Sequence, residues 1–265
     1  VNDPNVDAVY IGTPHPFHKD NALLCLEAGK AVLCEKPFTV NADDANVVIE
    51  AAKTKGLFLM EALWSRFLPA IVKMKALIAD GAIGEVRMVQ ADFGFRAPLD
   101  PEHRLFAPEL AGGALLDVGV YPINMAWMVL GAPADIQTTV HIGQTGVDEQ
   151  VGMLFHYAGG PIAVLSCATR TETQKEAIIS GTEGVIRVDA NWWQADKITL
   201  IKGEDTQVFE FPFDANGYEY EAREVGRCLR AGLTESPHMT HAETLAIMQT
   251  MDAIRAQWGL TYPME

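Results

Sequence analysis

The chain has 265 residues, 49% of them hydrophobic, so it can bury one large core or two ordinary ones, and a disordered protein is excluded. Its 35 acidic residues outnumber its 20 basic ones and give a formal net charge of -15. A field of that sign repels nucleic acid and anionic membrane surfaces, so neither is expected as a partner.

The cysteines indicate a reducing, cytoplasmic environment. They form no C-x-x-C pair and have no spacing that suits a zinc site or a disulfide framework; they are Cys25, Cys34, Cys167 and Cys228. The most apolar stretch, residues 112–131, contains Asp117 and Pro122. A membrane span would bury that charge and lose helical hydrogen bonds, so a buried helix of a soluble domain is predicted there.

The first part of the chain alternates short apolar runs with helical patterns. Strands are expected at 6–11, 31–34 and 57–61, with helices at 17–29 and 42–55. Continuous apolar strands between amphipathic helices are typical of a parallel sheet covered on both faces. This pattern predicts half of a doubly wound domain.

After a helix at 67–79 the pattern becomes that of a β-rich region followed by two helices. The turn signals between the strands predict hairpins in one large, open, mainly antiparallel sheet. The expected strands are 86–91, 136–142, 150–157, 162–169, 177–181, 184–188, 198–201 and 208–211, and the closing helices are 218–231 and 241–258.

The sequence therefore predicts an α/β plus α+β protein of two domains. Residues 1–64 form the end of a dinucleotide-binding Rossmann domain, and residues 65–265 form a substrate and oligomerisation domain whose last helix packs back on the first. The cleft between two such domains is the default ligand site.

The segment Gly12–His18 follows a strand and precedes a helix, at the edge where open α/β sheets bind ligands. Backbone amides at such a helix start can meet a ribose or a phosphate. The alternative is a stiff, proline-shaped turn with two surface histidines, His15 and His18.

The segment Glu35-Lys36-Pro37 also follows an apolar strand. Lys36 is a surface charge on one interpretation. On the other, its ammonium favours the negative form of a nearby alkoxide or phenol. Pro37 fixes the path of the chain beside it.

Asp117 and Tyr121 lie four residues apart in the most apolar stretch, so they share one face of the predicted helix. A phenol titrates near pH ~10 and needs a neighbouring cation to act as a base at neutral pH. Lys36 is the expected cation, and a core helix with one hydrogen-bonded tyrosine is the alternative.

Other site types have weaker support. The pairs His15-x-x-His18 and His238-x-x-His241 lack the further ligands of a metal motif, so no metal is expected. No G-x-S-x-G nucleophile turn occurs. Trp192-Trp193 is expected to pack against a strand or an interface, and stacking on a sugar is the alternative.

These motifs together resemble the glucose-fructose oxidoreductase, inositol dehydrogenase and rhizopine-catabolism (Gfo/Idh/MocA) family over nearly the whole chain. The residues that carry the resemblance are Thr13-Pro14, His18, Glu35-Lys36-Pro37, Met60–Phe67, Asp117-x-Gly119-x-Tyr121 and Gly181–Gly184. Tyr121, where many members have histidine, is similar to the branch of glucose-fructose oxidoreductase and dimeric dihydrodiol dehydrogenase.

The resemblance implies a hydride transfer between NADP or NAD, with NADP favoured by the branch, and a secondary alcohol or carbonyl carbon of a sugar, polyol or cyclic diol. It implies Tyr121 as the acid/base, Lys36 lowering the pKa of Tyr121, and Asp117 orienting substrate hydroxyls. It also implies a homo-oligomer, dimer or tetramer, through the open sheet. The cofactor contacts that it implies are Thr13, Pro14, His18, Glu35, Lys36, Pro37, Trp64 and Arg66.

One family feature does not occur in the sequence, which contains no G-x-G turn for the pyrophosphate. A missing N-terminal segment is the favoured explanation, because the first strand would otherwise be an exposed edge. The alternative is a non-catalytic binding or regulatory protein that has lost the dinucleotide-binding turn.

Overall fold

The computed structural model describes residues 1–265, and its first layer is a three-stranded parallel sheet. The strands β1 (Ala8–Ile11), β2 (Ala31–Glu35) and β3 (Leu59–Ala62) lie in the order β1-β2-β3, all parallel. Helices α1 (His18–Glu27) and α2 (Ala42–Lys55) connect them. The side chains of β3 are all buried, as expected for a strand of a covered parallel sheet.

The second layer is a sheet of eight strands in the order β11-β10-β9-β8-β4-β7-β6-β5. All neighbours are antiparallel except β4 and β7, which run parallel. The strands are β4 (Val86–Gly94), β5 (Asp135–Ile142), β6 (Asp148–His156), β7 (Ile162–Ala168), β8 (Ala177–Gly181), β9 (Val185–Val188), β10 (Lys197–Lys202) and β11 (Asp205–Glu210).

The predicted fold class is therefore confirmed, with one correction to the strand connections. We expected hairpins throughout the second sheet, but β4 lies between β7 and β8 and pairs with both. The chain after β7 must cross β4 to reach β8. β7 and β8 are consecutive in the sequence but not adjacent in the sheet, because β4, from earlier in the chain, lies between them.

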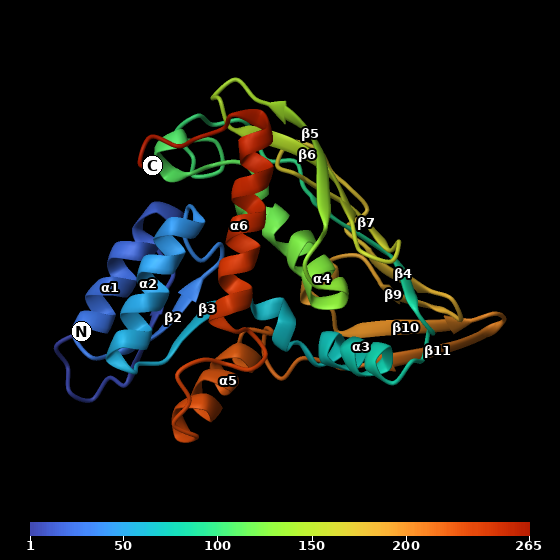
Figure 1. The fold of residues 1–265 in the computed structure, drawn as a ribbon, viewed down its shortest axis with the longest axis horizontal. Coiled ribbons are helices and arrows are strands. Elements are labelled where there is room, and N and C mark those ends of the chain that lie inside the picture. Colours follow the sequence, from blue (N-terminus) through green and yellow to red (C-terminus); the bar gives the residue numbers. More distant parts are fainter.

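Helices cover one face of this second sheet (Figure 1). The helix α4 (Val120–Leu130) packs against β4 and β7, and α3 (Pro69–Ala79) packs against β10. Along β6 the side chains of Val151, Met153 and Phe155 point to these helices and are buried, while the residues between them are more exposed. This alternation is typical of a sheet with one covered face.

The apolar stretch at 112–131 forms a buried helix with an irregular start. Residues Leu115–Gly119 form a π-helical turn, and α4 continues directly from it. The segment Pro108–Leu130 is long and apolar enough to cross a membrane, but 78% of its most apolar window is buried inside the fold. A core helix of a globular protein has the same length and composition.

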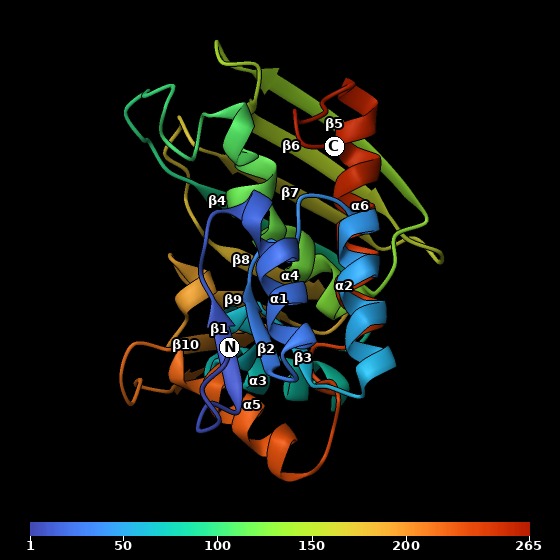
Figure 2. The same ribbon diagram turned by 90° about the vertical axis from the view of Figure 1, so that its left-hand side faces the viewer.

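Two helices complete the chain, α5 (Glu219–Arg230) and α6 (His241–Trp258). The long helix α6 lies between the two sheets and contacts α2 and β3 on one side and α4 and β5 on the other (Figures 1 and 2). The imidazole Nε2 of His241 lies 2.9 Å from the carbonyl oxygen of Leu59 on β3. The two layers thus meet around α6, with the carboxyl ends of β1 and β2 facing the start of α4.

Candidate active site

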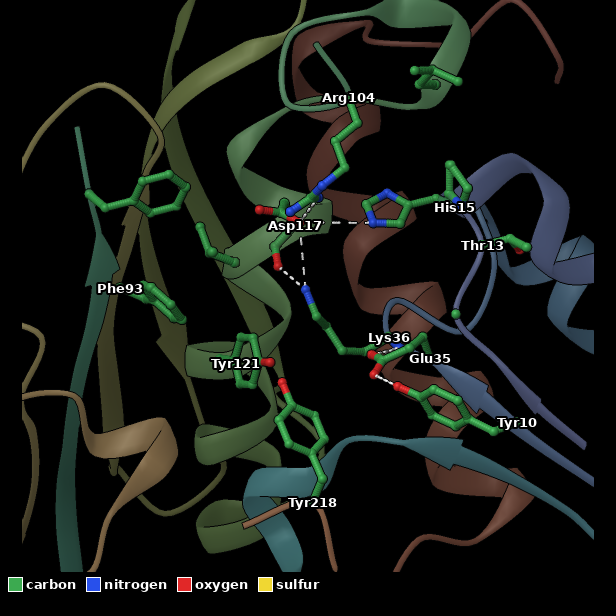
Figure 3. Close-up of a pocket in the computed structure, with 15 residues that line it drawn as sticks. Tyr10, Thr13, His15, Glu35, Lys36, Phe93, Arg104, Asp117, Tyr121 and Tyr218 are labelled. Carbon is green, nitrogen blue, oxygen red and sulfur yellow. Dashed lines mark hydrogen bonds and ion pairs between the residues drawn. The ribbon is translucent and has the colours of Figure 1, made fainter. Parts of the chain in front are cut away.

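A cavity of about 600 Å³ lies where the ends of β1 and β2 face the π-helical turn and α4. Thr13, Pro14, Glu35 and Lys36 line it from the strand ends. The opposite wall carries Asp117, Tyr121, Phe93, Arg104 and Tyr218 (Figure 3). The structure therefore brings most of the sequence-predicted site residues to one cleft.

Asp117 is the charged centre of this cleft. Its Oδ1 lies 2.6 Å from Nη1 of Arg104 and 3.6 Å from Nζ of Lys36. The Lys36 ammonium also donates to the Asp117 carbonyl oxygen at 2.5 Å. Burial raises the pKa of this carboxyl, but Lys36 and Arg104 outweigh burial and lower the pKa to about 2. Asp117 is therefore an anion held by two cations.

His15 and His18 are buried, so the interpretation as two surface histidines is wrong. Burial and the Lys36 charge lower the pKa of His15 to about 3, so its ring is neutral where Nε2 lies 3.9 Å from Oδ1 of Asp117. His18 does not line the cleft. Its two ring nitrogens lie 2.7 Å from the Thr13 carbonyl oxygen and 2.9 Å from that of Pro37, so it joins the two strand-end loops.

Tyr121 lies on the first turn of α4 with its phenol beside Lys36. The Lys36 ammonium is 5.2 Å from the centre of the Tyr121 ring, and the indole of Trp64 donates to the phenol oxygen at 2.9 Å. Burial raises the pKa of Tyr121 well above its usual value, and the charge of Glu35 raises it further. The expectation of a lowered pKa is therefore wrong in this structure, because burial outweighs the Trp64 hydrogen bond and Lys36 is paired with Asp117.

The Glu35 carboxylate bonds to Tyr10 and to the backbone of Lys36, and not to the Lys36 side chain. Its carboxylate accepts from the Tyr10 hydroxyl and from the backbone N–H of Lys36, the latter at 3.0 Å. Tyr10 belongs to β1, so the pair ties the ends of two neighbouring strands together.

Like His18 and Pro37, two more of the expected cofactor contacts lie outside the cleft. Trp64 sits behind Tyr121 and stacks on Tyr218, with ring centres 4.4 Å apart. The guanidinium of Arg66 is buried and bonds to Glu243 and to Asn124. Neither residue lines the cavity. Both therefore support the cleft wall or the α6 contact in this structure.

Sequence analysis missed Arg104, Tyr10, Tyr218 and Phe93. Arg104 lies in a loop, where no periodic pattern indicates which side chain turns inward. Phe93 follows the alternation of β4, but its neighbour is remote in sequence: its ring stacks on Trp193 with centres 3.4 Å apart. Trp193 thus supports the cleft from behind, and no local signal predicts that contact.

No three His, Cys, Asp or Glu side chains are grouped in a way that would hold a metal ion. The donor set fits a dinucleotide instead. A threonine hydroxyl and a lysine stand at the carboxyl ends of parallel strands, the edge at which such sheets bind nucleotides, and Arg104 adds a cation opposite them. The fold and cleft together are those of a dinucleotide-binding protein.

Comparisons with known proteins identify the family. Residues 1–63 match the model of the oxidoreductase family with an NAD-binding Rossmann fold, and residues 71–187 match the GFO/IDH/MocA C-terminal domain. The trans-1,2-dihydrobenzene-1,2-diol dehydrogenase of Danio rerio is 40% identical over 100% of this chain and 81% of its own length. The Sus scrofa enzyme of that name is 39% identical with the same coverage.

Solved structures agree with this assignment. The aldose-aldose oxidoreductase of Caulobacter crescentus, in complex with glycerol, is 27% identical with a TM-score of 0.88, covering 98% of this chain and 79% of that one. A 3-ketoreductase of Actinomadura kijaniata, in complex with NADP and TDP-benzene, is 25% identical with a TM-score of 0.83, covering 96% and 79%.

The chain belongs to the Gfo/Idh/MocA family. It is an NAD(P)-dependent dehydrogenase or reductase with an NAD(P)-binding Rossmann fold. The family and branch suggested by the motifs are confirmed, and the alternative of a non-catalytic protein loses its support.

Proposed function

We propose that this enzyme transfers a hydride between a nicotinamide cofactor and a secondary alcohol or carbonyl carbon of a sugar, polyol or cyclic diol. The observation that carries the proposal is the convergence of Lys36, Tyr121 and Asp117 in one cleft, with the Lys36 ammonium 5.2 Å from the Tyr121 ring. The names of the relatives support the substrate class, since they include a diol dehydrogenase and an aldose oxidoreductase.

The residues have separate roles in this proposal. Tyr121 exchanges a proton between its phenol oxygen and the substrate oxygen, and Lys36 supplies positive charge beside that exchange. Asp117, kept ionised by Lys36 and Arg104, accepts hydrogen bonds from neighbouring substrate hydroxyls. When bound, the nicotinamide supplies or accepts the hydride.

Thr13, Pro14, Glu35 and Lys36 would hold the nicotinamide half of the cofactor, because they line the cleft at the strand ends. His18 and Pro37 act behind them, since the His18 ring lies between the Thr13 and Pro37 carbonyl oxygens and its N–H donates to one of them. We propose NADP as the preferred form, in line with the family branch and with the NADP complex of the 3-ketoreductase.

We further propose that the protein forms a homo-oligomer through the uncovered face of the eight-stranded sheet. Met88 of β4 lies beside Ile162 of β7, and Val164 of β7 lies beside Leu154 of β6, all on this face. A solvated sheet face normally carries polar side chains, so an apolar patch there favours an interface.

The test is turnover with a panel of sugars, polyols and cyclic diols, with NADP and NAD compared by kcat/KM. Tyr121→Phe and Lys36→Ala should each lower kcat by about 10²–10⁴-fold, and Tyr121→Phe should change the Kd for the cofactor by less than about fivefold. Tyr157→Phe is the matched control, because its buried phenol has no partner and lies outside the cleft. Full activity of Tyr121→Phe would remove the phenol from the reaction.

A further inference from the structure

The segment that connects Arg104 and Asp117, the partners of the active-site ion pair, contains the turn Gly112–Gly113. Arg104 precedes this turn and Asp117 follows it, within the π-helical turn Leu115–Gly119. The N–H of Gly113 donates to the Leu105 carbonyl oxygen at 2.9 Å, so the turn is bonded to the residue next to Arg104. The position of this turn therefore sets the geometry of the ion pair.

A buried carboxyl from the second sheet anchors this turn. Asp148, the first residue of β6, is fully buried, and its Oδ2 accepts from the Leu115 N–H at 2.6 Å. That N–H is the first of the π-helical turn. From the other side, the Tyr262 hydroxyl donates to the Gly112 carbonyl oxygen at 2.7 Å.

The fit around Asp148 leaves no space for adjustment. A Cβ on Gly113 would lie 2.2 Å from Oδ1 of Asp148, and Gly113 has φ +123°, a backbone conformation that other residues rarely adopt. The same Oδ1 has no hydrogen-bond partner although it is buried. A buried carboxyl with a free oxygen is costly for the fold, which favours a role in function.

We propose that Asp148 is a positioning residue: it contacts no part of the cleft, but it holds the π-helical turn so that Asp117 and Tyr121 face Lys36. A π-helical turn is a rare conformation that occurs frequently at functional sites. The inference rests on the proposed function for its catalytic consequence, but its structural part stands on the Leu115 and Gly113 contacts alone.

The charge state of Asp148 adds a second readout. Burial raises the pKa of Asp148 to about 7, although the Leu115 amide and the charge of Arg255 favour the ionised form. Tyr262 and Cys167 are the other titratable groups that interact with it. The ionised carboxylate accepts the Leu115 N–H more strongly than the acid does, so the turn is held best above that pH.

Asp148→Asn tests the inference, since it keeps one acceptor oxygen but removes the charge. We expect kcat to fall by about 10–100-fold, with KM for the cofactor within about threefold of wild type. The part of the pH–rate profile that titrates near the Asp148 pKa should disappear. Hydrogen exchange of the peptide covering residues 113–121 should accelerate by about tenfold or more.

Phe155→Leu is the matched control, because Phe155 is buried on the same strand but about 20 Å from Asp148. It should lower the melting temperature without accelerating exchange in residues 113–121 or changing the pH profile. Equal losses of kcat in both variants would show a merely structural role and overturn the inference. So would unchanged exchange in Asp148→Asn.

The exchange measurement separates this inference from the proposed function. If wild type turns over none of the panel substrates while Asp148→Asn still loosens residues 113–121, the proposed function fails and the positioning role holds. If wild type is active and Asp148→Asn keeps both its kcat and its protection, the positioning role fails and the proposed function holds.

Discussion

The Lys36 ammonium lies between two groups that compete for its charge. It is 3.6 Å from the Asp117 carboxylate and 5.2 Å from the centre of the Tyr121 ring. Coulomb attraction falls with distance, and the Asp117 carboxylate is both nearer and ionised. Lys36 therefore interacts more strongly with Asp117 than with Tyr121. Tyr121 consequently stays a protonated phenol, which suits the donation of a proton to a substrate carbonyl.

Arg104 should help to keep the pKa of Asp117 low. The folded pKa of Asp117, about 2, is below its unfolded value, so the stabilisation is complete above that unfolded value and is lost as pH falls toward 2. Removing one of the two cations raises the folded pKa. Arg104→Gln should lower the free energy of unfolding by about 1 kcal/mol at pH 7, since Arg104 is half-exposed and screened.

Circular dichroism during acid titration checks this prediction, because the midpoint of acid unfolding should move to higher pH in Arg104→Gln. The control is Arg87→Gln, which removes an ion pair whose carboxylate, Glu85, is itself exposed. An equal shift of the midpoint in both variants would contradict the role of Arg104.

The raised pKa of Tyr121 predicts opposite pH dependence for the two directions of the reaction. Carbonyl reduction needs the phenol and should be constant through neutral pH, whereas alcohol oxidation needs a phenolate and should rise about tenfold per pH unit. Trp64→Phe removes the N–H that stabilises the phenolate, so the rise should move about one unit toward alkaline pH. Initial rates of alcohol oxidation from pH 6 to 10 measure this shift. If the pH profile of Trp64→Phe matches that of wild type, a group other than Tyr121 causes the rise in rate.

At the scale of elements, local sequence signals predicted those helices whose ends are capped by their own residues. The bounds of α2 were predicted correctly because Asn41 caps its start and Gly56 ends it in a left-handed conformation. The bounds of α6, between Thr240 and Gly259, follow in the same way. Elements held by remote contacts were not predictable in this way.

The π-helical turn and the parallel pairing of β4 with β7 are two such cases. Both depend on partners far along the chain, and periodicity carries no information about those partners. The site residues also fall into two groups, those that local motifs predict and those that the fold brings in. Motif residues Lys36, Asp117 and Tyr121 were assigned from sequence, whereas Arg104 enters from a loop whose direction only the fold determines.

The helix α5 carries a buried carboxyl that should make stability fall at alkaline pH. Burial, and then the charge of Glu35, raises the pKa of Glu221 to about 8. The folded pKa lies above the unfolded one, so the stabilisation is complete below pH ~4.5 and is lost as pH rises through 8. Glu221→Gln should therefore change little at pH 5 and stabilise the fold by about 1–3 kcal/mol at pH 9.

Urea unfolding at the two pH values measures this difference. Glu50→Gln, at an exposed position on α2, is the control and should behave alike at pH 5 and pH 9. If Glu221→Gln destabilises the protein equally at both pH values, the carboxyl is not held in its neutral form.

At the scale of the whole molecule, the two faces of the eight-stranded sheet have different environments. Helices cover the inner face, and the chain places no helix on the outer one (Figure 1). Val164, 43% exposed, lies near the middle of that outer face, on a strand with β4 on one side and β6 on the other. Its neighbours Met88, Leu154 and Ile162 are only partly buried in the single chain, as is Ile178 on β8, beyond β4.

This outer face should bury itself against a second copy of the chain. Burying apolar surface yields about 25 cal/mol per Å², and a stable interface needs roughly 800 Å² from each partner. Light scattering should give a mass of at least twice the 28.9 kDa of one chain. Val164→Glu would place a charge at the centre of the interface and should yield monomers, whereas Val208→Glu on the edge strand β11 should not. A wild-type protein that stays monomeric at all concentrations would contradict the prediction, because the apolar patch would then remain in water without a partner.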